Sequence, residues 1–298
     1  MNVLVTGGAG FIGRNLVERL VALTNCVTVL DDLSNAHNRD NPVPPGALFI
    51  NGNVKGFGDV AAYDVIYHLA CRNILQCVAA PQTDLAVNAG GTLSLLSALA
   101  ECGRSVKLVY ASSVSVKTLA SEYAISKAAG EHYVHLFRER NHVHADIIRY
   151  SNVYGPYQRD GVVMKMIDSV IAGQQIRIYG DGQQTRDFTY VGDVVSNTIA
   201  AGIFKSAVPD IPHESGTATA TTINKLARLV NAAAVANGLQ PAAIAHLPER
   251  AIDNVRYRIA SPSFPTHTLV PLDKGVALTF AWRLGNRGLR GDRANAVE

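Results

Sequence analysis

The chain has 298 residues and a mass of 31.8 kDa, with 48% hydrophobic and 17% charged residues. This composition provides enough apolar side chains for a buried core and excludes a disordered chain. The net charge is only +3 and no block of like charges occurs, which argues against nucleic acid or a membrane as the partner.

The four cysteines form no CxxC pair and show no disulfide-type spacing, which favours free thiols in a reducing compartment. The apolar run in MNVLVTGG is too short for a signal peptide, and no stretch has the length of a membrane span. We therefore expect a cytoplasmic protein.

Short apolar strands alternate with helical patterns over the first half of the chain. Strands are predicted at 2–6, 26–31, 64–70, 106–112 and 145–151, and helices at 10–23, 84–102 and 120–140. This alternation predicts an α/β fold, a Rossmann-type doubly wound parallel sheet. Glycines and prolines punctuate the rest, which predicts a smaller, mixed α/β C-terminal substrate lobe. The expected division is 1–155 for the sheet domain, with some later segments returning to it, and 156–298 mainly for the lobe.

Three glycines lie between the first strand and the first helix. Gly7, Gly10 and Gly13 give the spacing GxxGxxG, close to the GxGxxG pattern of dinucleotide-binding turns. Such glycines permit a tight turn, let the backbone approach a pyrophosphate, and let the helix pack on the strand. The N-terminus of the helix then offers N–H groups to the phosphates. The alternative is a glycine-rich turn that binds nothing.

The second strand ends in the acidic pair Asp31 and Asp32. Asp31 falls where a carboxylate would accept a hydrogen bond from an adenosine ribose. Because a carboxylate there repels a 2′-phosphate, the pattern favours NAD over NADP as the cofactor. Asp32 could instead cap a helix.

Tyr123 and Lys127 are four residues apart, which places them on one face of a helix. A nearby ammonium group favours the phenolate, so Lys127 is expected to lower the pKa of Tyr123 and make it an acid or base. Ser113, at the end of the strand before this helix, could bind the same substrate oxygen. The alternative is an exposed surface pair, although the small residues of AISKAAGE favour close packing against a cofactor and a sheet.

Taken together, these stretches resemble the extended short-chain dehydrogenase/reductase family, in its nucleotide-sugar epimerase/dehydratase branch. The matching motifs, which extend to about residue 260, are TGGAGFIG, LDDLSNA, HLA, VNAGGTL, ASS, YAISK, RYSNVYGP and YGDGQQTRDFTYVGDV.

The resemblance implies roles for individual residues. Ser113, Tyr123 and Lys127 would be the catalytic triad. Besides the three glycines, Tyr123 and Lys127, the residues bordering NAD would be Phe11, Ile12, Asp31, Asp32, Asn35, Asn53, Val54, Leu69, Ala70, Asn88 and Tyr150. The nucleotide diphosphate of the substrate would be bound by Asn152, Arg186, Arg250 and Asp253, with Arg256 as a further candidate.

The resemblance also reduces the number of candidate reactions. Dehydratases of the family carry an Asp-Glu pair directly after the triad hydroxyl, and related decarboxylases and 5,6-dehydratases keep a glutamate at the second position. Here Val114 and Ser115 follow Ser113. A 4-epimerase of a UDP-hexose or a close relative is therefore the first interpretation. The alternatives are a 4-ketoreductase and a non-catalytic NAD- or nucleotide-sugar-binding protein.

Two features depart from the family pattern. Ser113 and Tyr123 are only ten residues apart, where relatives carry a longer loop, and Asn53 replaces an aspartate on the adenine side.

Relatives often dimerise through two helices that form a four-helix bundle, and we expect a homodimer through 84–102 and 120–140. Apolar side chains such as Leu93 and Leu96 would then be covered by the partner subunit. The alternative is that both helices are buried within their own subunit.

Overall fold

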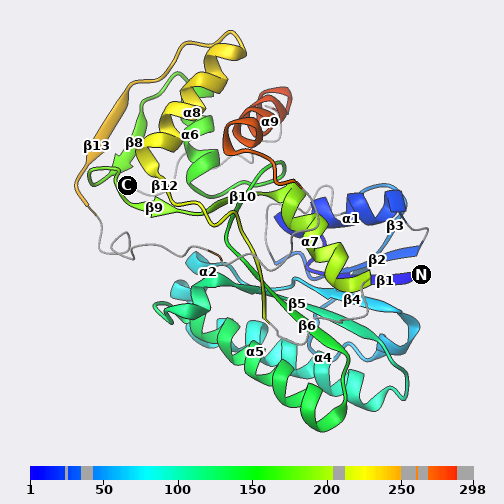
Figure 1. Ribbon diagram of the computed structural model, residues 1–298. Helices are drawn as coiled ribbons and strands as arrows, with labels where there is room; N and C mark the ends of the chain where they lie inside the picture. The colour runs from blue at the N-terminus through cyan, green and yellow to red at the C-terminus, as the bar shows by residue number, and fades with distance from the viewer. Residues whose placement is uncertain (24–25, 35–42, 204–211, 250–259, 261–267, 287–298) are drawn as a thin grey trace.

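The computed structural model describes residues 1–23, 26–34, 43–203, 212–249, 260 and 268–286. Seven strands form one sheet in which all neighbours are parallel (Figure 1). In spatial order they are β11 (His213–Ser215), β6 (Ala145–Tyr150), β5 (Lys107–Ser113), β4 (Val65–His68), β1 (Asn2–Thr6), β2 (Cys26–Asp31) and β3 (Ala47–Asn51). The strand order reverses between β1 and β4, which opens a crevice at the carboxyl ends of these strands.

Helices cover both faces of the sheet. On one face, α1 (Phe11–Leu23) and α7 (Val191–Ile203) enclose a core with β1 and β2, and on the other α4 (Gly90–Glu101) and α5 (Glu122–Asn141) enclose a second core. Short turns connect these layers: η2 (Asp59–Ala62), α2 (Ile74–Ala79), α3 (Pro81–Asp84), the π-helical η3 (Leu85–Ala89) and η4 (Val114–Lys117). Each helix therefore buries its apolar stripe against the sheet.

Local sequence explains the limits of α5. The hydroxyl of Ser121 accepts a hydrogen bond from the backbone N–H of Ala124, which caps the helix N-terminus. Arg138 and Arg140 lie in the last turn, where the helix dipole favours positive charge, and His142 ends the helix in a left-handed conformation. The cap fixes the first turn, which carries the tyrosine of the YAISK motif.

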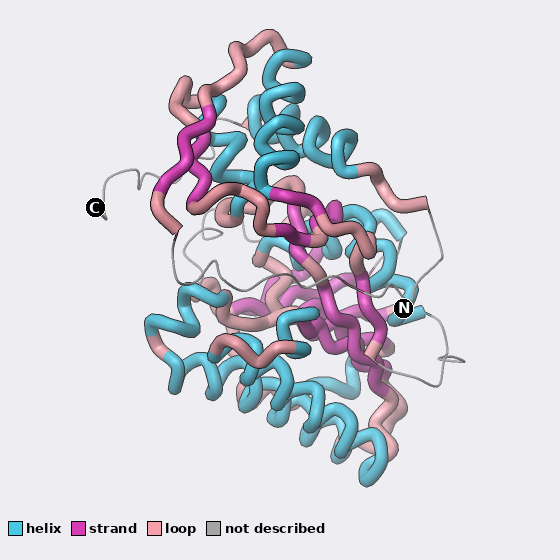
Figure 2. Tube along the Cα trace, turned by 60° about the vertical axis from the view of Figure 1, so that its left-hand side comes forward, coloured by secondary structure: helices cyan, strands magenta, loops and turns pink. Residues whose placement is uncertain are grey.

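A second group of elements has its own apolar core. It contains α6 (Val162–Ile171), α8 (Ile223–Ala236) and α9 (Leu272–Gly285), with three strand pairs: β8 (Ile176–Tyr179) with β13 (Ile244–Leu247), β9 (Thr185–Arg186) with β12 (Thr221–Thr222), and β7 (Asn152–Tyr154) with β10 (Phe188–Tyr190). Figure 2 shows these helices on the opposite side of the molecule from α4 and α5. Although α7 and β11 follow residue 155 in sequence, they pack in the large sheet layer. The expected division at residue 155 stays a prediction.

The predicted fold class is confirmed, and the five predicted strands lie within one or two residues of β1, β2, β4, β5 and β6. The predicted helix 84–102 is instead divided into the end of α3, the π-helical turn η3 and α4. Leu96, which we expected to be left uncovered, is fully buried against the sheet, whereas Leu93 is half-buried. None of the helices in the described segments has both the length and the apolar character needed to cross a bilayer.

Candidate functional site

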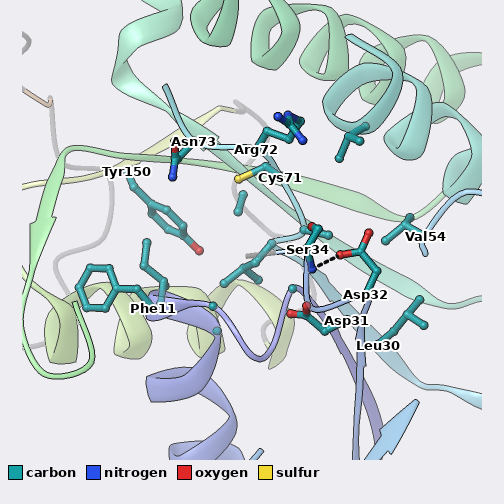
Figure 3. A pocket seen from close by; sticks show the side chains of 18 of the residues that line it. Phe11, Leu30, Asp31, Asp32, Ser34, Val54, Cys71, Arg72, Asn73 and Tyr150 are labelled. Carbon is teal, nitrogen blue, oxygen red and sulfur yellow. Dashed lines mark hydrogen bonds between the residues drawn. The ribbon is translucent and has the colours of Figure 1, made fainter. Parts of the chain in front are cut away.

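A cavity of about 350 Å³ lies at the carboxyl ends of the strands, in the crevice next to β1 and β4. Figure 3 shows the acidic pair Asp31 and Asp32 on one side of this cavity and Phe11 with Tyr150 on the other. Of the predicted cofactor residues, it is lined by Gly7, Gly10, Phe11, Ile12, Gly13, Asp31, Asp32, Asn53, Val54, Leu69, Ala70, Tyr123 and Tyr150.

The backbone turn after β1 depends on its glycines. Gly7 has φ +70°, and a Cβ there would lie 2.6 Å from the backbone nitrogen of Ala70. A Cβ on Gly13 would lie 2.2 Å from the carbonyl oxygen of Gly7, so this position fixes how closely α1 approaches the turn. The N–H groups in the first turn of α1 have no carbonyl partner within the helix. The turn therefore fits the pyrophosphate of a dinucleotide.

Asp31 lines the cavity at the end of β2. One of its carboxylate oxygens accepts a hydrogen bond from the N–H of Ala9 at 3.0 Å and the other from Leu33 at 2.9 Å. Burial raises the pKa of Asp31 and outweighs these two hydrogen bonds. Each carboxylate oxygen can accept a second hydrogen bond, so Asp31 can bind a ribose hydroxyl while it holds the turn.

A hydrogen-bond chain joins β1, β4 and α4 below the cavity. The hydroxyl of Thr92 donates to the carbonyl of Asn88 at 2.6 Å, so it must accept from Nε2–H of His68 at 3.1 Å. The Nδ1 of His68 then accepts from Thr6 Oγ1 at 2.7 Å, and Thr6 Oγ1 accepts from the N–H of Ala70 at 3.3 Å. Burial lowers the pKa of His68 to about 3, which keeps the ring neutral.

Tyr123 lines the same cavity and is partly buried. Burial raises the pKa of its phenol well above the usual range, and the neighbouring Cys71 and Tyr110 raise it further. We expected Lys127 to lower this pKa, but burial dominates and the net shift is upward. The Nζ of Lys127 instead lies 4.3 Å from the ring centroid of Tyr110. Burial lowers the pKa of Lys127, but the charges around it outweigh burial and the pKa is raised.

Ser113 ends β5 and caps the turn η4. Its Oγ accepts a hydrogen bond from the N–H of Ser115 at 3.2 Å, so the hydroxyl proton remains available to donate. Ser112, rather than Ser113, borders the cavity, and its hydroxyl donates to Glu131 at 2.5 Å. Val114 and Val116 are buried, so the short segment after Ser113 is packed as a turn.

Other predicted residues lie outside the cavity lining. Asn88 is fully buried, where its side chain binds Asp84 and Ser126 and accepts from the N–H of Arg72 at 2.8 Å. It therefore orients the chain that follows β4. Lys127, Asn152 and Arg186 do not line the cavity, and Asn35, Arg250, Asp253 and Arg256 lie outside the described residues.

Several cavity residues were not predicted. They include two groups: Cys71, Arg72 and Asn73 after β4, and Tyr157, Gln158, Arg159 and Asp160 after β7. The second group is held by α1, because the amide of Asn15 donates to the carbonyl of Pro156 at 3.0 Å and the hydroxyl of Tyr157 donates to Glu18 at 2.6 Å. The glycine and proline of YGPYQRD indicate a turn there, but they do not indicate which side chains reach the cavity.

Comparisons with known proteins agree with this geometry. Residues 3–203 match the model of the NAD dependent epimerase/dehydratase family. A putative UDP-glucose 4-epimerase of Methanocaldococcus jannaschii is 34% identical over 75% of this chain and 79% of its own length. A dTDP-glucose 4,6-dehydratase of Mycolicibacterium smegmatis is 32% identical over 65% of this chain and 66% of its own length.

Solved structures are similar over almost the whole chain. The UDP-glucose 4-epimerase of Thermotoga maritima, solved with UDP-glucose, superposes with a TM-score of 0.85 at 27% identity and covers 96% of this chain and 100% of its own. The UDP-glucose 4-epimerase of Thermus thermophilus, solved with NAD, has a TM-score of 0.81 at 29% identity, with coverage of 96% and 100%. NAD is thus the cofactor that fits the cavity, and the chain belongs to the NAD-dependent epimerase/dehydratase family of extended short-chain dehydrogenases/reductases.

Proposed function

We propose that the chain is a nucleotide-sugar 4-epimerase, with a UDP-hexose or a close relative as its substrate. The observation that carries the proposal is the placement of Tyr123 in the same cavity as the glycine turn and Asp31. The cavity thus combines a phenol for proton transfer with a carboxylate that can bind the cofactor's ribose. The similarity to UDP-glucose 4-epimerases supports this assignment.

The carboxyl groups around the cavity favour epimerisation over elimination. Asp31 and Asp32 lie at the ribose end and Asp160 on the segment after β7, while the turn η4 beside Ser113 carries none. Removing water from the sugar requires an acid and a base at the reacting carbons. Epimerisation requires only a proton acceptor for the 4-hydroxyl and space for the 4-keto sugar to turn.

The roles of the side chains follow from their positions. Bound NAD supplies a reversible hydride acceptor. Tyr123, as the phenolate, takes the proton of the 4-hydroxyl and returns it after the sugar has turned. Ser113 directly follows the cavity residue Ser112, and we infer that its available proton donates to the same sugar oxygen. Since burial raises the pKa of Tyr123, a positive charge must favour the phenolate, and the buried ammonium of Lys127 on the same helix contributes one.

The test is a panel of UDP-, dTDP-, GDP- and CDP-sugars incubated with purified protein without added cofactor. We expect one substrate to give its C4 epimer and reach a constant ratio from either side. A 4-keto-6-deoxy product, loss of CO₂, or no turnover despite bound NAD would contradict the proposal. Tyr123→Phe should lower kcat by about 10²-fold or more while NAD remains bound. A Phe variant with wild-type kcat would remove Tyr123 from the mechanism.

We also propose a homodimer through α4 and α5, which lie side by side on one face of the sheet (Figure 1). Ile125 on α5 is 54% exposed, and Leu93 and Leu136 are half-buried, so apolar side chains remain at the surface of this pair. Sedimentation velocity at micromolar concentration should give twice the mass of the chain, and a monomer would contradict this assembly.

A further inference from the structure

A set of polar contacts leads away from the wall of the cofactor cavity and begins at Ser112, directly before Ser113. The hydroxyl of Ser112 donates to Oε1 of Glu131 at 2.5 Å. Glu131 lies one helical turn after Lys127 and is only 5% exposed. Both of its oxygens bind Arg149, with distances of 2.9 Å to Nε and 2.6 Å to Nη2. The contact is therefore a bidentate guanidinium–carboxylate pair, which fixes orientation as well as distance.

The same contacts continue from Arg149 back to the turn after Ser113. Nη1 of Arg149 lies 3.6 Å from Oε1 of Glu214 on β11, and Oε2 of Glu214 accepts from Nζ of Lys117 at 2.7 Å. Lys117 is the last residue of η4, the turn capped by Ser113. The chain of contacts thus leaves the backbone one residue before Ser113 and returns four residues after it. We call these five side chains the Ser113 ring: Ser112, Glu131, Arg149, Glu214 and Lys117.

Charges alternate around the Ser113 ring. Glu131 and Glu214 are 5% and 6% exposed, so neither carboxylate could be buried at acceptable cost without a cationic partner. Arg149 serves both, and Lys117 provides the second cation for Glu214. The ring spans β5, η4, α5, β6 and β11. It therefore ties the turn that holds Ser113 to the helix that carries Tyr123 and Lys127.

The ion pair of Lys117 with Glu214 lies at the end of η4, where the chain to Tyr123 is short. Only nine residues separate Ser113 from Tyr123, and after η4 the chain passes through Leu119, a non-glycine residue with φ +49°. Within the turn, the N–H of Thr118 donates to the carbonyl of Ser115 at 3.2 Å. The hydroxyl of Ser113 therefore caps the start of this single turn, and the ion pair of Lys117 with Glu214 fixes its last residue.

We propose that Lys117 is a positioning residue, which acts through Glu214 to hold the Ser113 hydroxyl at a fixed distance from Tyr123. This inference rests on the proposed function, since it concerns the oxygen that Ser113 and Tyr123 share. Lys117 does not line the cavity, so its removal should affect the chemical step rather than the binding of the nucleotide sugar.

Lys117→Met tests the inference, because methionine keeps most of the length of the side chain and loses the charge. We expect kcat to fall by about 10-fold with KM within about twofold, and Lys117→Arg to recover kcat to within about threefold of wild type. The control is Arg104→Met. Arg104 also pairs with a carboxylate, Asp64, and is comparably exposed, but it lies away from the site.

Hydrogen exchange of the peptide spanning 112–120 provides a readout that does not depend on turnover. We expect faster exchange there in Lys117→Met and no change in Arg104→Met. Unchanged exchange in Lys117→Met, an equal loss of kcat in both variants, or no recovery in Lys117→Arg would overturn the inference. If wild type turns over no nucleotide sugar, the proposed function fails, and the exchange result still decides whether Lys117 anchors the turn.

Discussion

Asp31 supports the cavity wall through its hydrogen bonds, and we propose that it also selects the ligand. Its two oxygens hold the N–H groups of Ala9 and Leu33, and the same carboxylate faces the cavity. The sequence predicted its position at the end of β2, because a Rossmann strand places its last residue at the ribose. The sequence did not show that the carboxylate also holds the turn, since this contact joins residues 22 apart.

We expect Asp31→Asn to bind NAD about 10-fold more weakly or worse, since it loses a charge-assisted hydrogen bond worth about 1.5–3 kcal/mol. The variant also loses the charge that repels a 2′-phosphate, so the ratio of the Kd for NADP to that for NAD should fall. Isothermal titration with both cofactors measures this ratio. An unchanged ratio would show that Asp31 does not contact the ribose.

His68 makes the stability depend on pH in a defined direction. Its pKa is about 3 in the folded chain and about 6.5 when unfolded, so the unfolded chain takes up the proton first as pH falls. The contribution is fully present above pH 6.5 and is lost as pH falls toward 3. Between about pH 7 and about pH 5.5 the loss amounts to about 1 kcal/mol.

The check is urea unfolding at about pH 7 and about pH 5.5. His68→Gln should lose about 1 kcal/mol less than wild type over this interval, whereas His132→Gln, which changes an exposed histidine, should follow wild type. The same pH dependence in wild type and His68→Gln would contradict the neutral, buried ring.

At the scale of elements, α5 approaches the sheet closely because Gly130 has no side chain. A Cβ there would lie 2.2 Å from the hydroxyl oxygen of Tyr110, which donates to the carbonyl of Lys127 at 3.2 Å. The close approach therefore sets where Lys127 and Tyr123 stand relative to β5. The sequence indicated small residues at this point but not the tyrosine they contact.

Gly130→Ala should destabilise the protein by about 1–3 kcal/mol, although alanine favours an exposed helix by about 1 kcal/mol. Gly285→Ala is the matched control, since Gly285 also lies in a helix and a Cβ added there would meet no described atom within 4 Å. It should be neutral or stabilising in thermal unfolding. Two variants with the same sign would contradict the packing described for α5.

The elements that the sequence missed are those without a periodic pattern. Strand β3 is an edge strand in which Ala47 and Phe49 face the core while the apolar Leu48 is 71% exposed, so its sequence lacks the apolar–polar alternation of a half-buried strand. Strand β11 has only three residues and includes Glu214, whose burial depends on Arg149 and Lys117 far away in sequence. The break in the helix at 84–102 turns Asn88 inward, where it contacts side chains of α3 and α5. Tertiary contacts decide each case, and the sequence pattern does not contain them.

At the scale of the whole molecule, one cavity is lined by three parts of the fold: the carboxyl end of the parallel sheet, the turn after β7 and the helix α5. The order of motifs along the chain predicted this meeting, because parallel strands bring their carboxyl ends to one edge. The lobe built on α6, α8 and α9 was predicted only as a mixed region, since the contacts of Asn152 and Arg186 depend on short strand pairs.

The most direct measurement is the fate of hydrogen at C4 during turnover. With the substrate from the panel labelled with deuterium at C4, we expect the epimer to keep its deuterium at C4, and no NADH to be released. Retention of deuterium without release of NADH is the result expected when the hydride removed from C4 returns to the same carbon within one site. Loss of deuterium to solvent, or one free NADH per product, would contradict transient oxidation at C4 with a retained NAD as the hydride acceptor and Tyr123 as the acid/base.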